Sequence, residues 1–367
     1  MRKITNGSTA MGLAALLLVM VAAVPAAAKT ARFACSDKTD SARGFTVTVE
    51  GETATGHTAV PSTPPKGLVV YAHGYGHTTL SWLEHMKEAA RHGLVAVGMN
   101  YRGLEIIPDD DDEDSLPSSR GWNAMNGAED LIAAAQMYER SCPTIETITI
   151  YGVSMGGNMS GLAVALAGEN GLMKASPADD PLFDYWFDIE GSVNLIETYT
   201  ESRLAGGISE TAVKAQEDIE AETGGSFESA PDAFLERTVV ARTDDIAAAG
   251  LSGVVIVHGL NDGLVPYNQS RELAALLAMR GVPLDLFTVT LRDSDSEKET
   301  TLTGYVTDQV DPDHVSPFAG HGSEKSETHI VIQLGFERLW ALADDGATPG
   351  PYREFLANGD SGVVPPP

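Results

Sequence analysis

Five short runs with strand patterns, three of them largely apolar, are separated by segments with helical patterns and constrain the fold of this chain most strongly. A strand that is apolar along its whole length is buried on both faces, as in parallel sheets covered by helices. The runs are GLVVYAH (67–73), GLVAVGMNY (93–101), TIETITIY (144–151), GVVIVHG (253–259) and LDLFTVTL (284–291). Helical spacing of small and apolar residues occurs between them, at 79–92, 122–140, 155–168 and 269–280. This order predicts an α/β fold with a mostly parallel, twisted sheet flanked by helices.

The pattern changes between residues 195 and 250, where charged, alanine-rich helical stretches are interrupted by Gly224 and Gly225. Because strands resume at 253, we expect a helical cap at about 195–250, inserted into one domain that spans 29–345, rather than a second domain. Further elements are expected at 44–50 (strand), 184–193 (strand) and about 326–342 (helix), followed by an unstructured C-terminal tail at 346–367.

The first 28 residues have the three parts of a secretory signal peptide. Arg2 and Lys3 precede an apolar run at 11–24, and Ala26 to Ala28 provide a cleavage site. The apolar run holds about 14 residues, fewer than the roughly 20 that a membrane-spanning helix needs. We therefore expect a mature protein that begins after Ala28, has no stable membrane anchor and is secreted or periplasmic.

The net charge excludes two classes of partner. The formal charge is −28, and loss of the signal peptide changes it to −30 because it removes Arg2 and Lys3 and no acid. A surface of this sign repels nucleic acid and anionic membranes, so neither is expected to bind. Six consecutive acids lie at 109–114, where a solvated loop is favoured over a cation site.

Two cysteines, Cys35 and Cys142, are present in the chain. In the oxidising compartments that secretion implies, such a pair favours one disulfide over two free thiols. The expected bridge joins the N-terminal arm to the body of the domain.

Ser154 lies in the sequence YGVSMGG (151–157), directly between a predicted strand and a predicted helix. The G-x-S-x-G pattern by itself also occurs in ordinary glycine-rich turns. A sharp strand-to-helix turn, however, exposes the serine hydroxyl at the helix N-terminus and leaves no room for side chains at 152 and 156. The position of the motif therefore predicts that Ser154 is an activated nucleophile.

An activated serine needs a base to take its proton and a carboxylate to orient that base. Asp262, in the loop HGLNDGLVP after a buried strand, is the expected acid, although an aspartate at such a turn can also simply face solvent. Three histidines follow it. His321, in AGHGS just before the last helix, is favoured as the base, with His329 and His314 as alternatives. These two alternatives stay open because a polar loop at 293–316 lengthens the separation of Asp262 and His321 to 59 residues.

Acyl transfer also needs backbone N–H groups that bind the oxyanion of the tetrahedral intermediate. The residue after the nucleophile, Met155, is expected to supply one of them. The second is expected from Tyr75, in the run AHGYGHT (72–78) that ends an earlier strand. His73 and His77 precede the nucleophile and are expected to shape this loop.

Ser154 in GVSMGG, Asp262 in HGLNDGLVP, His321 in GHGS and the HGYG loop together resemble the α/β-hydrolase fold. Within it the chain is similar to secreted esterases and to dienelactone-hydrolase or prolyl-oligopeptidase-like members, over residues 66–345. The resemblance implies a sheet of about eight strands and the triad roles of these residues. The 195–250 insertion and the 293–316 loop depart from a minimal core.

The function expected from these features is the hydrolysis of a small-molecule carboxylic ester through an acyl-enzyme, with no metal or organic cofactor. A serine peptidase or aminoacyl amidase is the first alternative. A polyester hydrolase is the next, although the cap would narrow the open cleft that a polymer needs. A secreted binding protein that retained the fold without catalysis is the alternative from another class.

Overall fold

The computed structural model describes residues 35, 39–108, 116–207, 209–260, 262–290, 321–322, 324–325, 329–358 and 362–364. The predicted signal peptide, the acidic run at 109–114, the loop at 293–316 and His314 lie outside these residues.

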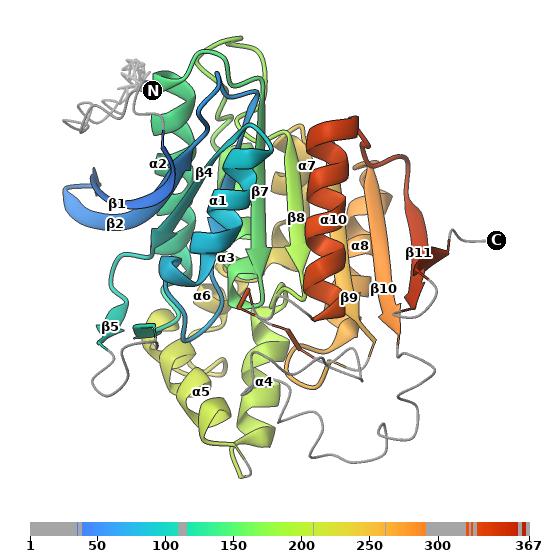
Figure 1. The fold of residues 1–367 in the computed structure, drawn as a ribbon. Helices are drawn as coiled ribbons and strands as arrows, with labels where there is room; N and C mark the ends of the chain where they lie inside the picture. The colour runs from blue at the N-terminus through green and yellow to red at the C-terminus, as the bar shows by residue number, and fades with distance from the viewer. Residues whose placement is uncertain are drawn as a thin grey trace, which may run out of the picture.

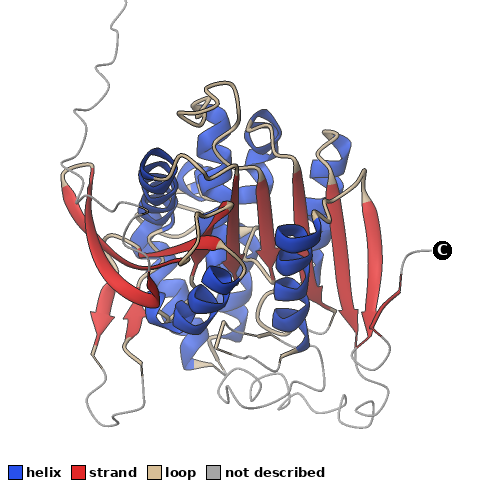
Figure 2. Cartoon of the chain, turned by 45° about the horizontal axis from the view of Figure 1, so that its top comes forward, coloured by secondary structure: helices blue, strands red, loops and turns tan. Residues whose placement is uncertain are grey.

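A ten-stranded sheet runs through the domain and carries helices on both faces (Figures 1 and 2). Neighbouring strands are parallel from β4 through β11, whereas β1, β2 and β12 pair antiparallel with their neighbours. The predicted mostly parallel α/β sheet is therefore confirmed. In spatial order the strands are β1 (Thr39–Val49), β2 (Glu52–Val60), β4 (Leu94–Asn100), β3 (Gly67–Ala72), β7 (Thr147–Val153), β8 (Tyr185–Ile189), β9 (Gly253–Gly259), β10 (Leu284–Thr290), β11 (Arg353–Asn358) and β12 (Gly362–Val364). Two short strands, β5 (Glu105–Ile107) and β6 (Ser118–Arg120), form a separate hairpin.

The last two strands of the sheet correct the expectation of an unstructured tail. The order begins with the eight strands that the resemblance implies, and β11 and β12 extend the sheet beyond β10. Strand β11 is held by tertiary contacts. Phe355 stacks on Phe287 with ring centroids 4.6 Å apart, and Arg353 makes two 2.6 Å hydrogen bonds to Asp285. These contacts, together with the backbone ladder to β10, hold the segment in the sheet.

Helices cover the two faces of the sheet in separate sets. Side chains alternate along each strand, so Val69 and Tyr71 belong to the core on the face that α1 and α10 cover, whereas Leu68 and Val70 belong to the core on the face that α2, α3 and α8 cover. The predicted helices are present with shifted ends, the first opening with a turn of 3-10 helix (η1, Thr79–Trp82). They are α1 (Leu83–Arg91), α2 (Ala124–Ser141), α3 (Met155–Glu169), α8 (Tyr267–Met279) and α10 (Ile330–Asp345).

The segment between β8 and β9 is helical, and it divides into two parts. Helices α4 and α5 pack together beyond the carboxyl ends of the strands (Figure 1). Helix α7 returns to α3, where a Cβ at Gly168 would lie 1.9 Å from the Asp245 carbonyl oxygen. The helices are α4 (Leu195–Ala205), α5 (Glu210–Thr223), α6 (Pro231–Glu236), η2 (Val239–Arg242) and α7 (Thr243–Ala248). From here on the name cap refers to α4 and α5 alone, because only these two of the five lie beyond the carboxyl ends of the strands (Figure 1).

The expected disulfide between Cys35 and Cys142 is present, with the two Cα atoms 5.4 Å apart. Cys142 is buried at the end of α2, so the bridge fixes the start of the described chain to that helix. In the part of the chain that the structure describes, every helix is too short or too polar to cross a bilayer.

Candidate active site

Ser154 occupies the turn between β7 and α3 in a conformation that few residues adopt, with φ 56° and ψ −123°. The turn is held from both sides, because Ser154 N donates to Ile189 O at 3.0 Å and Ser154 O accepts from Gly157 N at 2.8 Å. The flanking glycines are required sterically. A Cβ at Gly156 would lie 2.1 Å from the carbonyl oxygen of Ala72, as the spacing of the motif predicted.

The structure brings the three predicted triad residues together from three separate segments. The Nε2 atom of His321 lies 2.9 Å from Ser154 Oγ, and its Nδ1 atom lies 2.7 Å from Asp262 Oδ2. A carboxylate accepts only, so the ring donates its Nδ1–H to Asp262 and leaves Nε2 to accept the serine hydroxyl. This is the spacing that serine activation requires: nucleophile to base, and base to orienting acid.

Asp262 is a buried carboxylate rather than a turn residue that faces solvent. Its Oδ1 atom accepts the backbone N–H groups of Leu264 and Val265 at 2.8 and 2.9 Å. His258 Nε2 lies 3.2 Å from Oδ2, the oxygen that faces His321. Burial would raise the pKa of Asp262, but His321 and His258 hold it well below its usual range. Asp262 is therefore ionised when it meets the imidazole.

The alternative base His329 lies elsewhere in the site. The residue is fully buried at the N-cap of α10, one position before the helix in which we expected it. A Cβ at Gly322 would lie 2.7 Å from His329 Nδ1, so His329 packs against the loop that carries His321. Among the described residues, His321 is the histidine bonded to Ser154.

The predicted oxyanion donors lie next to Ser154. Met155 is the first residue of α3, and Tyr75 follows Gly74 in the loop after β3. This loop approaches the nucleophile closely, because a Cβ at Gly74 would lie 3.6 Å from Ser154 Cβ. The Tyr75 hydroxyl donates to Asp218 on α5 at 2.6 Å, so the loop is also tied to the cap. The oxyanion role of the two N–H groups stays a prediction.

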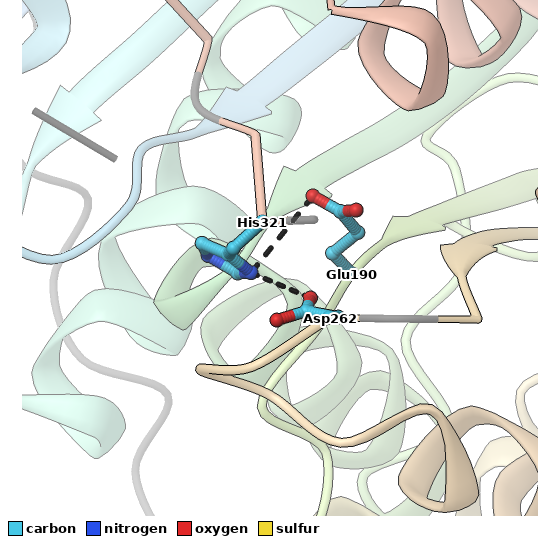
Figure 3. A group of neighbouring side chains, drawn as sticks. All are labelled: Glu190, Asp262 and His321. Carbon is cyan, nitrogen blue, oxygen red and sulfur yellow. Dashed lines mark hydrogen bonds and ion pairs between the residues drawn. The ribbon is translucent and has the colours of Figure 1, made fainter. Parts of the chain in front are cut away.

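Glu190, which the sequence reasoning missed, lies on the same side of the His321 ring as Asp262 (Figure 3). Its Oε2 atom accepts the backbone N–H of Gly322 at 2.7 Å and lies 3.8 Å from His321 Nδ1. A signal was present in the sequence. Glu190 directly follows β8, just as Asp262 follows β9, and the carboxyl ends of parallel strands meet at one edge of the sheet.

Glu190, Asp262 and His321 are also the described residues close enough to share a metal ion, with ligand atoms within 4.8 Å of one another. Their atoms are already engaged otherwise. Oxygens of the two acids accept N–H groups of Gly322 and His321, and the remaining ring nitrogen faces Ser154. These hydrogen bonds account for the positions of the three side chains.

Glu324 is a second residue that the sequence reasoning missed. It is fully buried three positions after His321, and its Oε1 atom lies 2.8 Å from His77 Nδ1 in the loop after β3. Burial alone would raise the pKa of Glu324, but His77 outweighs it, and the pKa is lowered to about 2. This contact joins His77 to the loop that carries His321, and the loop-shaping role expected for His77 stays a prediction.

Ser154 opens into a cavity of about 510 Å³ beneath the cap. Residues of α4 and α5 form one part of its wall, and the loop at 262–266 together with Tyr75 and Trp122 forms the rest. Most of the lining is apolar or carries small hydroxyl groups. A cavity of this size accommodates a small molecule, and the Ser154 hydroxyl lies in its wall.

No sequence model of a known family and no curated protein sequence matches the chain. Solved structures do match it. The chain is similar to a puromycin-hydrolysing peptidase of Mycobacterium tuberculosis, at 17% identity over 83% of this chain and 40% of that one, with a TM-score of 0.51. It is similar to a hyperthermophilic esterase of the archaeon Pyrobaculum calidifontis, at 16% identity over 85% and 86% of the two chains, with a TM-score of 0.53. An acylaminoacyl peptidase of Pyrococcus horikoshii matches at 16% identity over 67% and 36%, with a TM-score of 0.48. The chain thus spans two fifths or less of each of these two peptidases.

Proposed function

Starting from the α/β-hydrolase fold that the chain shares with these structures, we propose that it is a serine hydrolase that cleaves carboxylic esters. One observation carries the proposal: His321 bridges Ser154 Oγ, at 2.9 Å, and Asp262 Oδ2, at 2.7 Å. A strained serine at the N-terminus of a helix, bonded to a histidine that a buried aspartate orients, is the constellation of nucleophilic acyl transfer.

The proposed reaction proceeds in two steps. His321 Nε2 takes the proton of Ser154 while Oγ attacks the ester carbonyl, and the N–H groups of Met155 and Tyr75 stabilise the oxyanion. His321 then gives its proton to the departing alkoxide, which leaves as an alcohol. In the second step His321 deprotonates a water that attacks the acyl-serine, and the proton returns to Ser154 as the acid departs. Asp262 stabilises the imidazolium in both steps.

Ester hydrolysis is proposed ahead of peptide hydrolysis because of how the compared structures align. The chain spans 86% of the esterase but 40% of the puromycin-hydrolysing peptidase. A peptidase or aminoacyl amidase remains the second proposal, since the same triad cleaves amides when the leaving amine is protonated. Polyester hydrolysis is less favoured, because the cap encloses the cavity beside Ser154.

Secretion or export to a periplasm is proposed alongside this activity. The disulfide between Cys35 and Cys142 supports it, because such bonds persist in oxidising compartments. Mass spectrometry of the exported protein tests the expected cleavage after Ala28. A mature N-terminus at Lys29 supports the proposal, and an uncleaved or cytosolic protein contradicts it.

Labelling with a fluorophosphonate tests the nucleophile. The wild type should gain one adduct by intact mass, and Ser154→Ala should gain none. Ser202→Ala is the matched control, because Ser202 lines the same cavity and should label normally. An unlabelled wild type that is folded would overturn the proposal in favour of a binding protein. Matched esters and amides of one acyl group then separate esterase from amidase by their kcat/KM values.

A further inference from the structure

The cavity beside Ser154 carries negative charge that nothing in its wall balances. Its charged lining residues are Glu201 and Asp262, and the described lining includes no lysine, arginine or histidine. Asp262 is already engaged by His321 and His258. Glu201, on α4 of the cap, is different. Its Oε2 atom is buried and has no hydrogen-bond partner among the described residues.

The surroundings of Glu201 make its isolation costly. The pKa of Glu201 is raised to about 7, mainly by burial and further by the nearby carboxylates of Glu197 and Asp262. A half-buried carboxylate without a donor or a cation loses much of its hydration and gains nothing in return. An unpaired carboxylate of this kind lowers the stability of a protein, so its presence in a substrate cavity points to a functional role.

Other parts of the same wall also suit a positive charge. Tyr75 and Trp122 line the cavity, with ring centroids 5.9 Å apart, and aromatic faces attract cations. Leu264, Val265 and Ala212 supply apolar surface for the alkyl groups around such a charge. The formal charge of −28 on the whole chain gives a field of the sign that draws cations toward the cavity.

We propose that Glu201 is the subsite for a positively charged group of the substrate, so that the enzyme takes esters that carry an ammonium group. The inference rests on the proposed serine hydrolase function and names its substrate class. The cation balances Glu201 while the ester carbonyl lies against Ser154, and both contacts are made within one cavity. Because Glu201 lies on the cap, the cation also bridges α4 to the catalytic body.

Two pairs of esters, each with a neutral isostere of the same shape, test the charge alone. For the acyl side, the pair is the 4-nitrophenyl esters of 4-(trimethylammonio)butanoate and 5,5-dimethylhexanoate. For the alcohol side, the pair is the acetates of choline and 3,3-dimethylbutanol. The readout is the ratio of kcat/KM for the cationic ester to that for the neutral ester. Comparing this ratio between variants cancels the intrinsic reactivity of each ester.

At pH 8.5 the wild type should prefer the cationic member of at least one pair, and Glu201→Gln should lower that ratio about tenfold or more. The neutral ester should change no more than about threefold. Glu210→Gln, an exposed acid at the start of α5, is the control and should leave the ratio unchanged. A ratio that is equal in wild type and Glu201→Gln, or a wild type that prefers both neutral esters, overturns the inference.

The pH dependence gives an independent readout. A quaternary ammonium does not titrate, so the preference should increase as pH rises through about 7 and Glu201 ionises. The groups that face Glu201 are Glu197 on its own helix and Asp262 on the loop after β9, and both are acids. A pH effect on the reactivity of Ser154 itself changes both members of a pair equally and cancels in the ratio. A ratio that is flat from pH 6 to pH 8.5 contradicts the role of the carboxylate.

Two further measurements separate the failure of this inference from the failure of the proposed function. Fluorophosphonate labelling of every variant reports whether Ser154 is active and the protein folded, whatever the ester preference. Calorimetric titration with choline reads the subsite without turnover. Choline binding that weakens in Glu201→Gln supports the subsite, whereas equal binding to both proteins, or none to the wild type, overturns it.

Discussion

The carboxylate of Glu324 accepts the backbone N–H of Gly74 at 3.1 Å, so the loop that carries His321 is bonded to the loop that carries Tyr75. The same oxygen accepts the hydroxyl of Ser81 at 2.9 Å. The loops of the predicted general base and of one predicted oxyanion donor therefore share one buried carboxylate as a hydrogen-bond partner. We interpret Glu324 as a positioning residue that fixes the distance between these two parts of the site.

Replacing Glu324 with Gln keeps the size of the side chain but removes its charge. We expect kcat to fall about 10- to 100-fold while KM changes much less, because small displacements of catalytic groups cost rate rather than binding. Steady-state kinetics on a neutral ester provides the measurement. Glu84→Gln, an exposed acid on α1, should leave both constants unchanged. A change in KM as large as the change in kcat, or no change in kcat, would contradict a positioning role.

The same carboxylate should contribute to stability in a pH-dependent way. The pKa of Glu324 is about 2 in the folded protein, below its ordinary value of 4.5. Its contribution is therefore complete above pH 4.5 and is lost as pH falls towards 2. Between pH 5 and 2.5 the free energy of unfolding of the wild type should decline more than that of Glu324→Gln, by about 2 kcal/mol. Urea denaturation across this range measures the difference, and parallel curves would refute it.

Asp262→Asn tests how the base is oriented. Asparagine can still accept the N–H groups of Leu264 and Val265, so the loop should keep its shape. It no longer selects the ring tautomer that leaves Nε2 free to accept from Ser154, and kcat should fall about 10⁴-fold. Asp244→Asn is the control, since Asp244 pairs with Arg280 at the exposed surface. A loss below about tenfold would remove Asp262 from the triad.

The nucleophile turn should tolerate no side chain at position 156. A Cβ there would lie 2.1 Å from the backbone oxygen of Ala72, and backbone of a central strand cannot move without disturbing the sheet. We expect Gly156→Ala to lower the free energy of unfolding by about 3 kcal/mol and to abolish labelling of Ser154. At Gly207 an added Cβ meets no described atom within 4 Å, so Gly207→Ala should behave as wild type in denaturation and labelling.

The disulfide should stabilise the domain without affecting chemistry. It closes a loop of 107 residues, for which chain entropy predicts about 4 to 5 kcal/mol. The variant Cys35→Ser with Cys142→Ser should unfold at a lower denaturant concentration, and a reducing agent should shift only the wild type. Its kcat/KM on a neutral ester should stay near that of the wild type. Equal midpoints for the oxidised wild type and the variant would show that the bridge contributes little.

The local sequence pattern alone was sufficient to predict the buried strands, the turn at Ser154 and the disulfide. The runs at 67–73 and 253–259 are apolar except for one histidine each, because both faces of the sheet are covered, and that burial is visible in the residues themselves. The turn at Ser154 is equally local, since its neighbours in the chain must be small whatever else the fold does. Two cysteines permit one pairing, so the bridge also required no knowledge of distant contacts.

The tertiary structure alone decided which residues meet across long separations in the chain, and so which hydrogen bonds and environments the polar side chains have. Glu190 and Gly322 are 132 positions apart in the chain, and Gly74 and Glu324 are 250 apart, so the local sequence does not identify the partner of either acid. The strand at 353–358 is a strand because β10 offers it an edge and an aromatic partner. Glu201 resembles any acid on a charged helix until the fold places it in the cavity of Ser154. The hydrophobic pattern of a strand or helix reflects its burial and can be read from the local sequence. The environment of a polar side chain, in contrast, exists only once distant segments have packed together.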